Sequence, residues 1–170
     1  RFFGWQRQPK QISVQQRIEK AISTILRTPT NIVGCGRTDT GVHASEYYAH
    51  FDAEQPLPER FLHSLNGILR HDVVVYRVLP VAADAHARFD AKSRSYRYYL
   101  SLRRNPFRQE TAYHYPLSRR LDLDKMQAAA QLLLDYQHFD TFCKTNTDVK
   151  TKLCQLTRSE WVHAPEQHQL

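Results

Sequence analysis

Residues 36–44, GRTDTGVHA, carry the densest group of chemically capable side chains in the sequence. One carboxylate, Asp39, lies between two glycines and is flanked by Arg37 and His43. A carboxylate in such a loop can face a substrate and be tuned by a nearby cation, so Asp39 is a candidate nucleophile or general base. The loop has neither a Walker pattern nor a GxGxxG fingerprint, which disfavours nucleotide-cofactor binding. An aspartate that only closes an Asx turn is the alternative, and the spacing leaves it open.

Two further chemistries are weaker candidates at the same loop. Asp39, His43 and His50 could ligate a metal, but His-x6-His matches no common zinc pattern and no second carboxylate lies nearby. Cys35 could act as a thiolate, but no Cys/His motif accompanies it. We therefore expect no metal site, and the lack of clustered carboxylates also disfavours a metal-dependent RNA hydrolase.

The positive charge of the chain is concentrated in one segment. The chain has 24 Lys and Arg against 17 Asp and Glu, a net charge of +7. Nine of the basic residues but only two acidic ones lie between His86 and Arg120, together with seven aromatic residues. Cations neutralise phosphates and aromatic faces stack on unpaired bases, so the segment predicts an RNA or single-strand surface. A strand with an Arg-rich exposed face is the alternative.

Length and composition limit the class of protein. The 170 residues, 41% of them hydrophobic, can form one ordinary domain or two small ones. There is no apolar run of membrane-spanning length and no signal-like start, so we expect no membrane span and a cytoplasmic location. Three widely spaced cysteines make a disulfide framework improbable.

Alternating helical and extended patterns predict the elements that position these residues. Ser13 is expected to cap a helix that runs to Pro29, and a helical stripe is expected over 61–69. Asp122 is expected to cap a third helix that runs through Leu134. Short strands are expected over 31–33, 45–52, 93–102 and 153–162, and a buried strand over 73–81. Residues 145–152 are polar and are expected to be mobile. The pattern favours an α+β fold, a mixed or antiparallel sheet with helices on one face.

Four motifs in order resemble the tRNA pseudouridine synthase A family. GRTDTGVHA is similar to the family's GRTDAGVHA, with Thr40 in place of the usual alanine. FGWQRQ with SVQQRIEKAI, HARFDAKSRSYRYYL and QHFDTF resemble other family segments in the same order. The resemblance covers essentially the whole chain. It implies the pseudouridine synthase fold, with halves similar to RRM or ferredoxin-like domains.

The resemblance also implies an activity, the isomerisation of uridine to pseudouridine at nucleotides 38 to 40 of the tRNA anticodon stem-loop, without a cofactor. The matching aspartate is Asp39, as nucleophile or base. Tyr96 would stack on the flipped base and could assist proton removal from C5. Arg37 would help to open the helix or hold the flipped-out geometry. RNA-binding candidates are Arg7, His43, Arg88, Arg94, Arg97, Arg103 and Arg104. A non-catalytic RNA-binding module on the same scaffold is the alternative function.

The resemblance implies a domain organisation and a partner as well. Residues 1–80 would form an N-terminal half-domain with the catalytic loop. Residues 81–170 would begin a second half-domain with the basic and aromatic segment. The family's opening strand and its C-terminal part have no counterpart here, so we expect a chain that is incomplete at both ends. The family pattern further implies a homodimer that binds tRNA.

Overall fold

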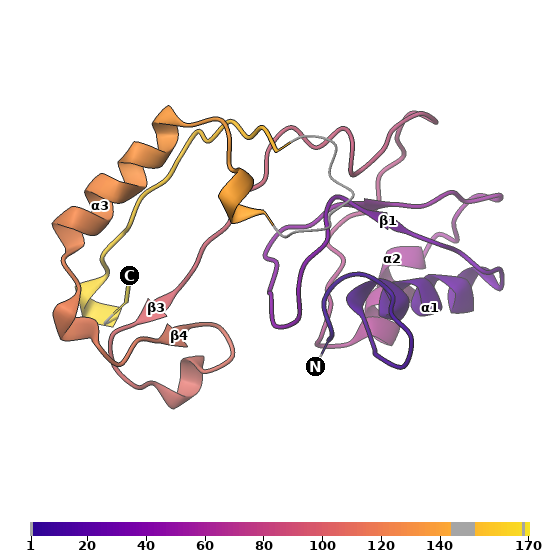
Figure 1. Ribbon diagram of the computed structural model, residues 1–170. Coiled ribbons are helices and arrows are strands. Elements are labelled where there is room, and N and C mark those ends of the chain that lie inside the picture. Colours follow the sequence, from indigo (N-terminus) through magenta and orange to yellow (C-terminus); the bar gives the residue numbers. More distant parts are fainter. Residues whose placement is uncertain (1, 144–151, 168) are drawn as a thin grey trace. The chain divides into compact units, whose positions relative to one another are not determined.

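The computed structural model describes residues 2–143, 152–167 and 169–170, in two compact units that divide after Tyr96. The first unit contains the helices α1 (Val14–Leu26) and α2 (Phe61–Leu69) and the strands β1 (Val33–Gly34) and β2 (Ala49–His50) (Figure 1). The second contains β3 (Leu100–Ser101), β4 (Tyr113–His114) and α3 (Leu123–Leu132). This mixture of helices and small sheets confirms the α+β class. The half-domains 1–80 and 81–170 stay a prediction.

Local sequence signals begin and end the first helix. The Ser13 hydroxyl accepts a hydrogen bond from the Gln16 amide at 3.2 Å, which satisfies one of the free N–H groups at the start of α1. Arg27 has a left-handed backbone with φ of 56° and ends the helix two residues before Pro29. The predicted start of this helix is therefore confirmed, and its end lies slightly earlier than expected.

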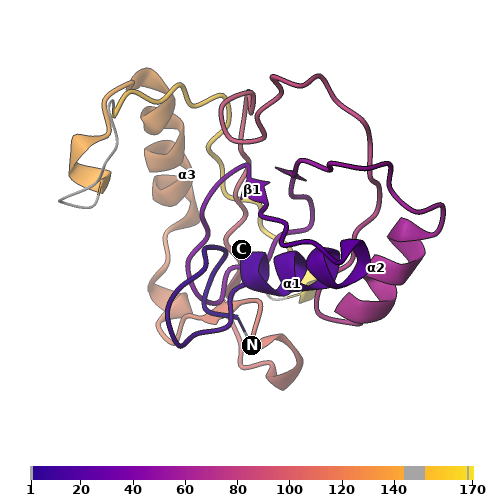
Figure 2. The same ribbon diagram turned by 90° about the vertical axis from the view of Figure 1, so that its right-hand side faces the viewer.

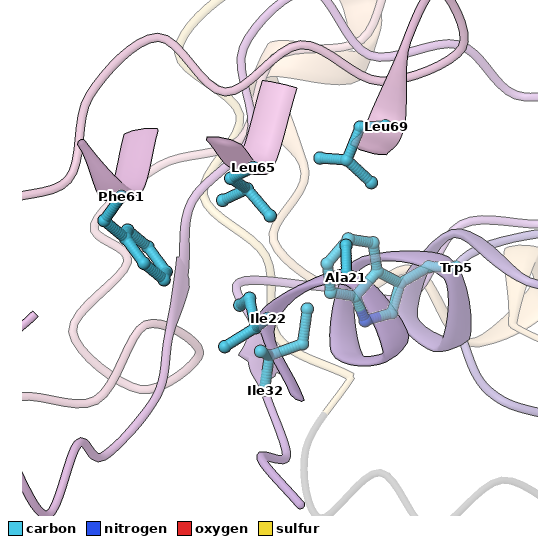
Figure 3. Packing of buried hydrophobic residues seen from close by; sticks show 7 residues of the cluster. All are labelled: Trp5, Ala21, Ile22, Ile32, Phe61, Leu65 and Leu69. Atoms are coloured by element: carbon cyan, nitrogen blue, oxygen red, sulfur yellow. The ribbon is translucent and has the colours of Figure 1, made fainter. Parts of the chain in front are cut away.

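The core of the first unit lies between α1 and α2. The two helices contact each other and lie side by side in both ribbon views (Figure 1; Figure 2). Figure 3 shows seven buried side chains that gather between them and the neighbouring segments: Trp5, Ala21, Ile22, Ile32, Phe61, Leu65 and Leu69. Burial of these apolar side chains holds the N-terminal segment, both helices and the approach to β1 together.

The second unit is organised around α3 and a short parallel sheet. Asp122 caps α3 by accepting a hydrogen bond from the Lys125 amide at 3.1 Å, as predicted. β3 pairs with β4 in parallel, with Leu100 opposite Tyr113. The strand β4 was not predicted, because the segment from Arg103 to Leu121 reads as a loop.

Most of the predicted strands are shorter than expected. β1 and β2 pair antiparallel over two residues each, with Val33 opposite His50. The predicted buried strand over 73–81 is wrong: the side chain of Asn66 bonds both the N–H and the C=O of Val75, and Tyr76 is 73% exposed. Of the predicted strand 93–102, only β3 is paired. Of the predicted strand 153–162, only Leu153 is paired, in a single bridge to His138. The segment 145–152, predicted to be polar and mobile, lies outside the described residues except for Lys152.

Candidate active site

Asp39 lies on the loop that connects β1 to β2. Arg37, Asp39 and His43 are all exposed on this loop. Within the described part of the chain, the Asp39 carboxylate makes no hydrogen bond or ion pair. The backbone of the loop, by contrast, is held by hydrogen bonds that include those at Gly36, Thr38 and Asp39. The side chain is thus accessible while its Cα position is restrained.

The first anchor joins the middle of the loop to the hydrophobic core. The amide of Trp5 donates a hydrogen bond to the carbonyl of Thr38 at 3.0 Å, and the Trp5 ring is buried in the core. Gly4 permits this approach, since a Cβ at that position would lie 2.4 Å from the Thr38 oxygen and 3.2 Å from the carbonyl carbon of Asp39. Gly4 also has φ of +77°, which disfavours other residues. The residue before Asp39 is therefore fixed directly to the core segment.

The second anchor is the hydroxyl of Tyr47 at the entrance to the loop. It donates a hydrogen bond to the Gly36 carbonyl and accepts one from the Gly36 amide at 3.3 Å. Its ring packs against Trp5 with centroids 4.2 Å apart. Burial raises the pKa of Tyr47 to about 12, against a lowering by the hydrogen bond to Gly36. The neutral hydroxyl can therefore serve as donor and acceptor at once across the physiological range.

The third anchor is a tight turn that immediately follows Asp39. The amide of Val42 donates to the carbonyl of Asp39 at 3.3 Å, and Gly41, at the third position of this turn, has φ of +82°. A glycine with positive φ at that position is typical of a type II turn. The turn, rather than an Asx bond from the Asp39 side chain, reverses the chain here, which leaves the carboxylate available.

Arg94 and Arg88, both predicted to bind RNA, lie near the base of this loop. The guanidinium of Arg94 donates to the carbonyl of Cys35 and to the carbonyl of Arg88. Arg88 is exposed, with its guanidinium carbon 5.9 Å from the ring centre of Phe89. The structure thus brings Arg94 to the loop that carries Asp39. The RNA-binding role of both arginines stays a prediction.

Arg7 has a partner that sequence reasoning missed. Its guanidinium pairs with the carboxylate of Glu19, a side chain only 4% exposed. Glu19 also accepts hydrogen bonds from the Ile32 amide and from Gln15, both at 3.1 Å. The spacing of Glu19, three residues before the core residue Ile22, is the signal that could have revealed its burial. Arg7 lies only two residues after Trp5. The Arg7–Glu19 ion pair therefore also restrains the segment whose Trp5 amide bonds to Thr38.

The aromatic candidate, Tyr96, ends the first unit and is 80% exposed. The predicted residues Arg97, Arg103 and Arg104 belong to the second unit and are exposed. Arg104 lines a pocket of about 440 Å³ in that unit. The stacking and phosphate-binding roles of these residues remain predictions.

The candidate metal ligands do not cluster in the structure. No group of three or more His, Cys, Asp or Glu side chains with metal-binding proximity occurs among the described residues. His50 uses Nδ1 to accept a hydrogen bond from the amide of Ala87 at 3.1 Å. In the same described ranges, none of the helices has the length and apolar character needed to cross a bilayer.

Comparison with known proteins finds many similar sequences. The chain is 48% identical to the tRNA pseudouridine synthase A of Parabacteroides distasonis over 162 residues, 94% of this chain and 64% of that protein. It is 48% identical to the protein of the same name from Porphyromonas gingivalis, over 95% of this chain and 65% of that protein. The Bacillus licheniformis protein of that name is 38% identical, over 94% of this chain and 66% of the relative. The chain thus spans slightly less than two thirds of the length of these relatives. No protein-family model matches it.

Proposed function

Because the chain is homologous to the tRNA pseudouridine synthase A family over most of its length, we propose that it isomerises uridine to pseudouridine in tRNA. The observation that carries the proposal is the exposed carboxylate of Asp39 on a loop whose backbone is bonded to the core through Trp5. A protein that only binds RNA does not need a carboxylate facing a polyanion, since the two repel. Such a carboxylate is expected where it takes part in chemistry.

The proposed reaction is an isomerisation that needs no oxidant, reductant or added group. The bond between N1 of the base and C1′ of the ribose breaks, the base turns, and C5 bonds to C1′. C5 then loses its proton to solvent and N1, which carried none while bonded to C1′, gains one, so atoms and charge balance. Asp39 starts the sequence either as a nucleophile or as a base. Its exposure is compatible with both roles, because each requires contact with the substrate.

The proposed substrate is a uridine at nucleotides 38 to 40 of the anticodon stem-loop. A base inside a stem must leave the stack before its glycosidic bond is accessible, at a cost of about a few kcal/mol. Tyr96, exposed at the end of the first unit, is proposed to stack on the extruded base. Arg37, two residues before Asp39, is proposed to hold the tRNA stem in the conformation in which the base is flipped out.

Phosphate contacts are proposed to offset the rest of the cost of extrusion. His43, Arg88, Arg97, Arg103 and Arg104 are exposed cations or polar groups suited to that role. Arg7 is a weaker candidate, because its guanidinium is already paired with Glu19.

We infer the finer architecture and the assembly from the same resemblance. The two units are proposed to be parts of a pseudouridine synthase fold in which a mixed sheet carries helices on one face. A homodimer that binds tRNA with both subunits and works in the cytoplasm completes the proposal. Sedimentation of the chain with and without tRNA tests the oligomeric state.

The direct test is release of tritium from C5-labelled uridine in tRNA by the wild type, Asp39→Asn and Asp39→Ala. We expect release by the wild type and its loss in both variants, with tRNA affinity retained. Asp84→Asn is the matched control, because Asp84 is an exposed carboxylate in the same unit outside the loop. Binding without release by the wild type would favour a non-catalytic RNA-binding module. Release that survives Asp39→Ala would remove Asp39 from the mechanism.

A further inference from the structure

We propose that Arg94 is a positioning residue, which holds the base of the Asp39 loop against the segment that leads to Tyr96. Its guanidinium would then donate hydrogen bonds to backbone carbonyls rather than bind RNA phosphates. The catalytic part of this inference rests on the proposed function, whereas its structural part can be tested without activity.

Three hydrogen bonds attach Arg94 to two separate segments. Nε and Nη2 donate to the carbonyl of Cys35 at 3.2 and 2.6 Å, and Nη2 also donates to the carbonyl of Arg88 at 3.1 Å. A Cβ on Gly36 would lie 3.5 Å from Nε, so the side chain runs directly along the loop entrance. Cys35 and Arg94 are 59 residues apart in sequence, so these bonds fix a long-range contact.

The second carbonyl belongs to a turn that is itself held in place. In residues 86–90 the amides of Phe89 and Asp90 donate to the carbonyl of His86, at 3.1 and 2.9 Å. The Asp90 carboxylate accepts a hydrogen bond from the His86 amide at 2.6 Å. The amide of Ala87 donates to Nδ1 of His50, in β2. Arg94 therefore bonds to a turn that is fixed by its own hydrogen bonds.

These bonds form a closed circuit. Cys35 follows β1, β1 pairs with β2, β2 carries His50, and His50 holds the turn that Arg94 joins back to Cys35. Breaking the circuit at Arg94 would leave the loop entrance attached through β1 and Tyr47 but free to move relative to the turn. Tyr96 is only two residues beyond Arg94. The same break would therefore let Asp39 and Tyr96 move relative to each other.

The chemistry of the side chain separates this role from a phosphate contact. Guanidinium presents several donors in a fixed plane and can reach two carbonyls at once. The ammonium of lysine is a point charge that binds a phosphate well but does not reproduce a planar fork. Arg94→Lys should therefore preserve a phosphate contact and disrupt a positioning contact.

The test combines kinetics, binding and hydrogen exchange on wild type, Arg94→Lys, Arg94→Ala and the control Lys20→Ala. For Arg94→Lys we expect kcat to fall about 10- to 100-fold, the effect of misplacing a reacting group by about 1 Å. We expect the Kd for tRNA and its salt dependence to change less than about twofold. Amide exchange in the peptide covering 36–42 should accelerate about tenfold, the change that loss of about one hydrogen bond produces. Lys20→Ala, at an exposed cation of α1 outside the basic segment and the loop, should change none of these measurements.

Each other outcome overturns part of the proposal. Near-normal kcat in Arg94→Lys, with a raised Kd and a salt slope reduced by about 1 in Arg94→Ala, would identify a phosphate contact instead. If amide exchange in α1 accelerated as much as in residues 36–42, Arg94 would stabilise the whole first unit rather than position the loop. If the wild type releases no tritium, the proposed function fails, and exchange in residues 36–42 alone then decides whether Arg94 holds the loop.

Discussion

Replacing Gly4 with alanine tests how the Asp39 loop is attached to the core. Two costs can be worked out from the structure. A non-glycine residue at φ of +77° costs about 1 kcal/mol. The new Cβ would lie 2.4 Å from the backbone oxygen of Thr38, so the loop must move and the bond from the Trp5 amide is lost, at about 1 kcal/mol more. We expect Gly4→Ala to lower the free energy of unfolding of the first unit by about 2–3 kcal/mol.

Two other glycines provide matched controls. Gly41 has φ of +82°, but a Cβ added there would meet no atom within 4 Å, so Gly41→Ala should cost only the conformational part, about 1 kcal/mol. Gly67 lies in α2 with free space and an ordinary backbone, so Gly67→Ala should raise the free energy of unfolding by about 0.5–1 kcal/mol. Comparison of the three variants therefore separates the steric cost of a Cβ near Thr38 from the cost of a positive φ and from the gain in helix propensity.

Urea unfolding followed by tryptophan fluorescence measures these differences. The chain has two tryptophans, and Trp161 belongs to the second unit, so a Trp161→Phe background lets Trp5 report on the first unit. Equal losses for Gly4→Ala and Gly41→Ala would refute the close approach of Gly4 to Thr38. Normal turnover by a stable Gly4→Ala protein would refute the inference that this anchor positions Asp39.

Other perturbations address separate parts of the molecule. Glu19→Ala should lower the free energy of unfolding by about 3 kcal/mol, because it leaves buried donors unpaired, whereas Glu19→Gln should cost less in the same urea assay. Burial raises the pKa of Tyr47 from 10.0 to about 12, so the stabilisation by its neutral hydroxyl is complete below pH 10 and declines between about pH 10 and 12. The difference in unfolding free energy between wild type and Tyr47→Phe should shrink over that range, and a constant difference would contradict the assignment. Tyr96→Phe should bind tRNA better than Tyr96→Leu, and equal affinities would exclude stacking as its main role. Alanine at both Arg103 and Arg104 should weaken tRNA binding and flatten its salt dependence, and an unchanged slope would mean that neither side chain contacts phosphate.

Helices and caps could be predicted from the sequence because their determinants are local. The Ser13 and Asp122 caps depend on side chains within three residues of the amides they satisfy. Strands were overpredicted for the opposite reason. A strand needs a partner backbone from elsewhere, and at Val75 the side chain of Asn66 took that place.

By itself, the sequence determined the loop that carries Asp39, the two helices that form the first core, and the basic and aromatic segment. These features follow from residue type and spacing. Only the tertiary structure decided that Gly4 and Trp5 hold the loop, that Glu19 is buried beneath Arg7, and that Arg94 binds carbonyls. Those contacts join residues 12 to 59 positions apart. Their partners depend on how distant segments pack, which no local spacing specifies.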